Sequence, residues 1–184
     1  MNPVLLETLR TAQRFGFFGS RPIEEAAEHS MDFVRAVGEL DRTARLVDLG
    51  SGGGLPGLVL ADALAETTIV LLDRRQKRTD FLQRSVITLG MRHVEVRCAD
   101  VKVLIDEVGS GVTPPFDVVT ARGFGPPEFT LRSAARLIRP GGRIVISEPP
   151  AGDRWSAELL DELGLSATAS GRVRVFALPS APLV

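Results

Sequence analysis

The sequence predicts a doubly wound α/β fold in which helices cover both faces of one mostly parallel, seven-stranded sheet. Three observations predict it: apolar strands alternate with amphipathic segments from Arg45 onward, a glycine-rich turn follows the first strand, and two short strands end the chain like a hairpin. With 184 residues and 44% hydrophobic residues, the chain suits one domain with a sizeable core. We expect an N-terminal helical segment, residues 1–40, packed on an α/β domain, residues 41–184.

Two helices are expected before the sheet. The first twenty residues open with leucines and a valine at helical spacing, and a second helix is expected from Pro22 to about Leu40. This second helix carries His29 and Asp32 three residues apart, and therefore on one face. Between the helices lies an aromatic–glycine cluster, residues 15–19, for which we weigh packing on the ligand side of the domain against capping of the core. We favour the core-capping interpretation.

The sheet and its helices follow in a regular order. Short runs of β-branched and apolar residues predict strands, and apolar residues three or four apart predict the helices between them. The strands are expected at 45–49, 68–73, 93–98, 116–121, 143–147, about 165–169 and about 172–178. The helices are expected at about 57–65, 76–89, 127–138 and 153–163, with a short one after the third strand.

The strongest functional signal is the loop after the first strand. Asp48, Gly50, Gly52 and Gly54 fill the pattern D-x-G-x-G-x-G. Glycines let the backbone turn sharply and let a ligand lie against it, and the helix that follows supplies unpaired N–H groups. Asp73 ends the next strand, where a carboxylate can accept both hydroxyls of a ribose. The arrangement predicts a site for a nucleoside cofactor.

Two cofactors could use such a loop. Gly52, Gly54 and Gly57 also satisfy G-x-G-x-x-G, and Asp73 follows at about the 20-residue spacing of a nicotinamide dinucleotide site. Asp48 favours S-adenosylmethionine, because a carboxylate there suits an ammonium and a sulfonium but would repel a pyrophosphate. The chain is also too short for a dinucleotide half plus a substrate domain. We therefore expect a methyltransferase rather than a dehydrogenase, with an unliganded glycine turn as the remaining alternative.

Other strand ends carry further candidates, because ligands of doubly wound sheets bind outside the carboxyl ends of the strands. Ala99 and Asp100 follow the third strand; Asp100 could accept from an adenine amino group or cap the helix that starts at Val101, and we favour the adenine role. Arg122 follows the fourth strand, where it could clamp the cofactor carboxylate or a substrate phosphate, or lie on a surface loop. Ser147 and Glu148 follow the fifth strand.

The net charge limits how the chain could contact nucleic acid. The net charge is −1, so any such contact needs a local basic patch. The basic run 74–78 is a candidate, with a solvated helix face as the alternative. We expect its side chains to point along the helix and not into the glycine loop.

The scarce residue types are also informative. Cys98 is the one cysteine, which excludes an internal disulfide and fits a reducing compartment. Two histidines and this cysteine suggest no metal site, and no Ser–His–Asp arrangement is indicated. We expect no signal peptide and no membrane span, hence a cytoplasmic protein. The missing general base suits an acceptor with a free lone pair, such as guanine N7.

Several motifs resemble one known family. Residues 48–57 read D-L-G-S-G-G-G-L-P-G, and 77–82 read K-R-T-D-F-L. Residues 116–122 resemble F-D-x-V-x-[ST]-R-A with its small positions shifted by one residue, and His29 with Asp32 is similar to H-x-x-D. Over roughly residues 22–147 the chain resembles the glucose-inhibited division protein B family, the small-subunit ribosomal RNA guanine-N7 methyltransferases. The G-L-P-G end of the loop is the most specific part.

The resemblance implies a class I S-adenosylmethionine-dependent methyltransferase fold, which seven strands with a terminal hairpin match. It implies cofactor contacts at Gly50, Leu55, Ala99–Asp100 and Arg122, with Asp73 on the ribose. The departures concern the substrate side. The family's asparagine-leucine-threonine segment has no counterpart before Pro22, its lysine-glycine after strand five is Ser147–Pro150 here, and its arginine-histidine motif is reduced to residues 171–174.

The expected function is methylation of guanine N7 in small-subunit ribosomal RNA. Asp48 and the glycine loop would hold the methionine moiety, and ribosomal RNA or the small ribosomal subunit would be the partner of a protein that could act as a monomer. A small-molecule methyltransferase on the same scaffold is the first alternative. A cofactor-binding module without catalysis is the second.

Overall fold

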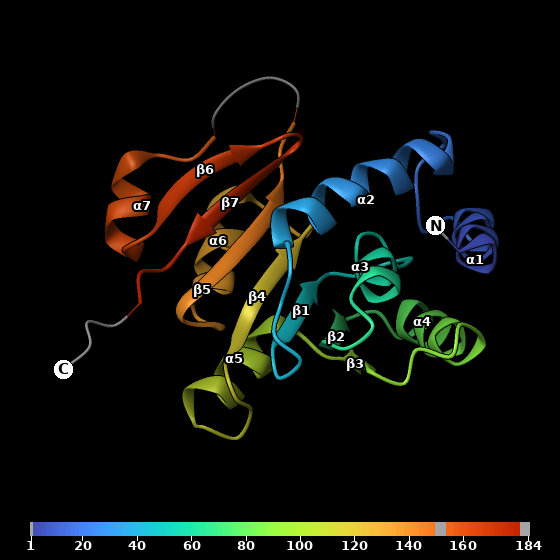
Figure 1. Ribbon diagram of the computed structural model, residues 1–184, viewed down its shortest axis with the longest axis horizontal. Coiled ribbons are helices and arrows are strands. Elements are labelled where there is room, and N and C mark those ends of the chain that lie inside the picture. Colours follow the sequence, from blue (N-terminus) through green and yellow to red (C-terminus); the bar gives the residue numbers. More distant parts are fainter. Residues whose placement is uncertain (1, 150–153, 181–184) are drawn as a thin grey trace.

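The computed structural model describes residues 2–149 and 154–180 and confirms the doubly wound α/β fold. One seven-stranded sheet has the order β3-β2-β1-β4-β5-β7-β6, in which β7 runs antiparallel to both its neighbours, β5 and β6, and all other pairs are parallel (Figure 1). The chain builds outward from β1 to β3 and then returns to β4 on the other side of β1. This reversal leaves a crevice at the carboxyl ends of β1 and β4, where open α/β sheets bind ligands.

The elements follow the predicted order. The strands are β1 Arg45–Leu49, β2 Thr68–Asp73, β3 Val94–Cys98, β4 Phe116–Ala121, β5 Ile138–Ser147, β6 Ser166–Ser170 and β7 Val173–Ala177. The helices are α1 Pro3–Arg14, α2 Ile23–Val37, α3 Gly57–Ala63, α4 Gln76–Thr88, α5 Val101–Gly109, α6 Pro127–Ala135 and α7 Ala157–Leu163. Within the described residues, no helix is both long and apolar enough to cross a bilayer.

Two apolar clusters hold the layers together, one on each face of the sheet. Leu46 belongs to the cluster formed with α1 to α4, whereas Val47 belongs to the cluster formed with α5 to α7. Neighbouring strand residues therefore face opposite layers, as the period of two along a strand requires. Because both faces are covered, the central strands are apolar on both sides, which is why their sequences read as continuous apolar runs.

Several element ends differ from the sequence-based expectation; helix α6, for example, ends at Ala135 rather than at residue 138, and α7 begins at Ala157. Strand β5 begins at Ile138 rather than at residue 143, because Ile138 pairs with Phe116 ahead of an irregularity and Arg143 pairs with Val118 after it. Helix α2 ends at Val37, where Gly38 takes a positive φ of 65° and stops the helix before Leu40. The expected start of the last helix, residue 153, lies outside the described residues.

The aromatic–glycine cluster lies over the glycine loop, and Phe18 also packs against the apolar core, so this segment takes both of the roles weighed for it. The ring of Phe17 meets the ring of Phe81 on α4 edge to face, with centroids 5.5 Å apart. A Cβ added at Gly53 would lie 2.6 Å from Cζ of Phe18. The aromatic side chains therefore need the bare backbone of the loop beneath them, and the segment after α1 forms one wall of the ligand side.

Candidate functional site

Three hollows meet at the carboxyl ends of the parallel strands. The glycine-loop cavity, about 630 Å³, lies between residues 50–55 and residues 17–29. The Asp73 cavity, about 390 Å³, lies between Asp73–Arg78, Ala99–Val101 and residues 123–129. The Glu148 cavity, about 760 Å³, lies between residues 121–130, the end of β5 and Arg172. Gly123 lines all three, so the hollows adjoin one another, and together they are called the groove.

Asp73 joins the glycine loop to the start of α4. Its Oδ2 accepts a hydrogen bond from the backbone N–H of Gly52 at 3.0 Å, and its Oδ1 accepts one from the N–H of Arg75 at 2.9 Å. The side chain of Asp73 is only 4% exposed, yet it lines the cavity named after it. Each carboxylate oxygen has a further lone pair, so the same group can still accept from a ligand.

Arg78 corrects the expectation that the basic run points away from the loop. Its Nη1 lies 3.4 Å from Oδ2 of Asp73, and it would lie 3.6 Å from a Cβ added at Gly52. Arg78 lines both the glycine-loop cavity and the Asp73 cavity. Arg78 lies in the first turn of α4, where its backbone N–H donates to the carbonyl of Arg75 at 2.9 Å. This turn places the Arg78 side chain beside Asp73.

Asp48 lies beneath the loop, completely buried, and lines none of the three cavities. Its Oδ1 accepts from the hydroxyl of Thr120 at 2.8 Å. Burial raises the pKa of Asp48 to about 6, although the hydrogen bond from Thr120 opposes the rise. Its Oδ2 makes no hydrogen bond within the described residues and would lie 2.7 Å from a Cβ added at Gly57, so Asp48 lies directly under the start of α3. The direct cofactor contact expected of Asp48 stays a prediction.

Some of the remaining loop residues line a cavity, and others pack against neighbouring side chains. Gly50 lines two cavities with a φ of 70°, and a Cβ there would lie 2.8 Å from Cδ2 of Phe124. Gly52 and Leu55 line the glycine-loop cavity. Gly54 lines no cavity, and a Cβ there would lie 2.4 Å from Cδ1 of Leu58.

Ala99 and Asp100 line the Asp73 cavity, as their place after β3 predicts. Asp100 caps α5, with Oδ1 accepting from the N–H of Lys102 at 3.0 Å. The capping role that the sequence analysis placed second is therefore present, and the adenine role stays a prediction. Across the cavity, the rings of Phe124 and Phe129 stack with centroids 5.8 Å apart.

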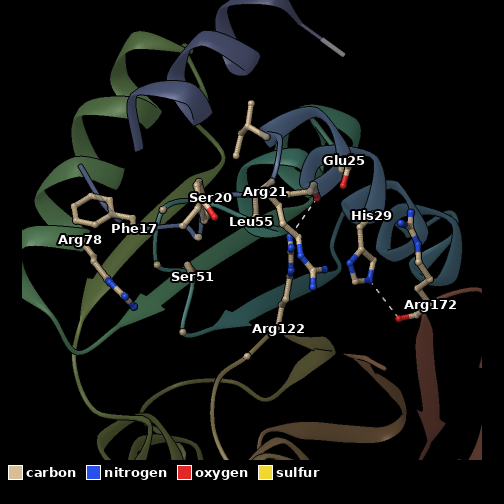
Figure 2. Close-up of a pocket in the computed structure, with 18 residues that line it drawn as sticks. Phe17, Ser20, Arg21, Glu25, His29, Ser51, Leu55, Arg78, Arg122 and Arg172 are labelled. Atoms are coloured by element: carbon tan, nitrogen blue, oxygen red, sulfur yellow. Dashed lines mark hydrogen bonds between the residues drawn. The ribbon is translucent and has the colours of Figure 1, made fainter. Parts of the chain in front are cut away.

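Helix α2 positions two arginines of the groove. Arg122 donates from Nη1 to the carbonyl of Ala26 at 3.2 Å, and burial lowers its pKa. Arg172, at the β6–β7 turn, donates from Nε to Oδ2 of Asp32 at 2.6 Å. Figure 2 shows Arg122 and Arg21 reaching into the glycine-loop cavity from opposite sides, with His29 directed at the carbonyl of Arg172. Burial and the charge of Arg122 lower the pKa of His29, so its ring is neutral at pH 7.

Sequence reasoning missed three kinds of residue here. Phe124 and Phe129 carried no motif, although both follow the fourth strand, where a ligand was expected. Arg172 was read only as a remnant of a reduced motif, and Arg21 was not considered. No group of three metal-ligating side chains occurs among residues 2–149 and 154–180.

Comparisons with known proteins agree with this geometry. The profile of the family described as rRNA small subunit methyltransferase G matches residues 5–158. The ribosomal RNA small subunit methyltransferase G of Ralstonia nicotianae is 33% identical over 171 residues, covering 83% of this chain and 73% of that protein.

Solved structures share the fold. A putative O-methyltransferase from Klebsiella pneumoniae has a TM-score of 0.69 at 19% identity, covering 98% of this chain and 91% of that one. A SAM-dependent methyltransferase from Aquifex aeolicus has a TM-score of 0.61 at 14% identity, covering 92% and 97%. The expected class I methyltransferase fold is thereby confirmed.

The Asp48–Thr120 contact generates the first prediction. Replacing Thr120 with valine removes a hydrogen bond that favours the ionised carboxylate, so the pKa of Asp48 should rise further above about 6. Between about pH 4 and pH 6 the Asp48 carboxyl holds a proton in the native state but has lost it in the unfolded state. Through this group, the free energy of unfolding therefore falls as the pH rises across that window and is constant above it.

In the Thr120→Val protein this fall should extend to higher pH. Carbon-13 NMR titration of the Asp48 carboxyl, with denaturant unfolding at pH 5 and pH 8, measures both effects. Thr168→Val, on the exposed strand β6, is the matched control. An Asp48 carboxyl that titrates near 4 in the wild-type protein would contradict the prediction.

Proposed function

The chain belongs to the rRNA small subunit methyltransferase G family, and from that premise we propose that it methylates guanine N7 in the RNA of the small ribosomal subunit. S-adenosylmethionine is the methyl donor. The observation that carries the proposal is the groove at the β1–β4 reversal, where the Asp73 carboxylate and the glycine loop are joined by one hydrogen bond. The proposed partner is ribosomal RNA or the small subunit, and the proposed location is the cytoplasm.

The residues present fit this cofactor. We assign the adenosine to the Asp73 cavity, with Asp73 accepting from the ribose hydroxyls and Ala99 and Asp100 near the adenine. At Gly50 any side chain would collide with Phe124, so glycine lets that ring close over the backbone. An apolar ring at this place suits the face of an adenine.

We assign the methionine end to the glycine-loop cavity, along Gly50, Gly52 and Leu55. Arg122 is held there by the carbonyl of Ala26, and its guanidinium suits the carboxylate of the cofactor. Asp48 acts from below: its contacts with Thr120 and the start of α3 keep the loop in shape. Asp48 therefore positions the loop and need not touch the cofactor.

The cofactor supplies an electrophilic methyl group on a sulfonium. The chain's task is to hold a guanine so that its N7 lone pair lies in line with the bond that breaks. No residue needs to remove a proton, because N7 carries none. This agrees with the groove, in which His29 is neutral and hydrogen-bonded to the carbonyl of Arg172.

Charge in the groove suits an RNA substrate although the whole chain carries −1. Four arginines line the glycine-loop cavity, and one glutamate does so. They come from four separate parts of the chain: Arg21, Arg78, Arg122 and Arg172. Clustered guanidiniums attract phosphates locally, whatever the overall charge.

Methyl transfer tests the proposal directly. Purified protein should move labelled methyl groups from S-adenosylmethionine to small ribosomal subunits, or to their RNA, taken from cells without the enzyme. The product should be 7-methylguanine on nucleoside analysis. Transfer to small molecules only, or cofactor binding without transfer to any ribosomal particle, would contradict it.

Asp73 generates a second test of the cofactor site. Asp73→Ala removes two backbone hydrogen bonds and the ribose acceptor, so S-adenosylhomocysteine should bind roughly ten- to a hundredfold more weakly. The free energy of unfolding should also fall, by about 1–3 kcal/mol. Calorimetric titration and denaturant unfolding measure the two effects.

Asp80→Ala is the matched control, because Asp80 lies on α4 and, within the described residues, its side chain accepts a hydrogen bond only from the side chain of Gln76. It should leave cofactor affinity unchanged. Equal affinities of Asp73→Ala and the wild-type protein would remove Asp73 from the proposed site.

A further inference from the structure

The Glu148 cavity has features that cofactor binding does not use. It opens beside the glycine-loop cavity and shares Arg122 and Gly123 with it. It is therefore next to the place where the methyl group would lie, yet outside the part of the groove assigned to the cofactor. Its lining combines one carboxylate with four arginines, Arg21, Arg122, Arg154 and Arg172.

Only one of the two carboxylate oxygens of Glu148 is held by neighbouring side chains. Its Oε1 accepts from the indole Nε1 of Trp155 at 2.5 Å, and Nε of Arg154 lies 3.5 Å from the same oxygen. The Glu148 side chain is 12% exposed. Among the described residues, no hydrogen bond reaches Oε2, and Glu148 lines the cavity, so this oxygen can still accept from a ligand there.

The same cavity contains a second unsatisfied group. Thr130, 3% exposed, has an Oγ1 that makes no hydrogen bond within the described chain. Buried polar atoms are normally paired, and leaving one unpaired costs stability. The hydroxyl is itself buried, so it can contact a ligand in the cavity only if the Thr130 side chain turns. The carboxylate oxygen of Glu148 without a hydrogen-bond partner in the described chain is therefore the group that indicates a polar ligand.

Guanine has the complementary edge. Its N1–H and its exocyclic amino group are neighbouring donors that a carboxylate can accept together, whereas adenine presents an acceptor at N1. N7 lies on the opposite edge of the purine, so a guanine held by its N1 side keeps N7 free. Enzymes that modify a base take it out of the stack and read this edge in a pocket.

We propose that the Glu148 cavity binds the target guanine, with Glu148 accepting from N1–H and the amino group. The assignment rests on the proposed function and deepens it, since it names the residue that selects guanine. Arg172 and Arg21 stand at the side shared with the glycine-loop cavity, where phosphates of the flanking nucleotides would pass. Glu148 acts here as a specificity-determining residue.

A base substitution tests the proposal without altering the protein. Inosine has the guanine ring without the exocyclic amino group and keeps N7. Small-subunit RNA with inosine at the methylated position should be methylated with a kcat/KM roughly ten- to a hundredfold lower than the guanosine RNA. Equal rates on the two RNAs would overturn the assignment.

Glu148→Gln tests the residue itself. The amide oxygen can still accept from Trp155, while its NH₂ group meets the guanine donors in place of Oε2. Transfer to guanosine RNA should fall, and the preference for guanosine over inosine should shrink. The affinity for S-adenosylhomocysteine and the thermal midpoint should not change, because Glu148 lies outside the assigned cofactor contacts.

Glu158→Gln, an exposed position in the first turn of α7, is the matched control and should behave as wild type. If Glu148→Gln keeps the wild-type guanosine-to-inosine ratio, the assignment fails while the proposed function stands. If the wild-type protein methylates neither RNA yet binds the cofactor, the proposed function itself fails. Should Glu148→Gln lower the thermal midpoint, the inosine comparison on the wild-type protein decides alone.

Discussion

The carboxylate of Asp73 sets the geometry on which the groove depends. By accepting from the N–H groups of Gly52 and Arg75, it fixes the glycine loop at the end of β1 against the start of α4. Arg78 is drawn onto the same carboxylate, and Asp48 holds the loop from beneath through Thr120. Two carboxylates thus shape a loop that has little side-chain packing of its own.

Helix α2 performs the corresponding task on the substrate side. The carbonyl of Ala26 holds Arg122, and Asp32 holds Arg172 of the terminal hairpin. The helix therefore links the end of β4 to the β6–β7 turn and gathers positive charge around the groove. An RNA-binding surface can in this way form on a chain whose net charge is −1.

Much of the fold could be predicted from local pattern, because strands such as Thr68–Asp73 and Phe116–Ala121 are apolar runs whose ends are set by the next turn. Contacts between distant segments could not. Periodicity says nothing of Phe18 packing on Gly53, of Arg78 turning toward Asp73, or of Arg172 meeting Asp32. The start of β5 was missed because the irregular pairing after Ile138 interrupts its pattern with a proline and two glycines.

The most direct measurement of the central claim is a map of modified nucleotides in small-subunit ribosomal RNA from cells with and without the gene. Our account predicts that a single 7-methylguanosine is present with the gene, absent without it, and restored by the wild-type protein but not by a variant that cannot bind the cofactor. Identical maps from the two strains would contradict the account.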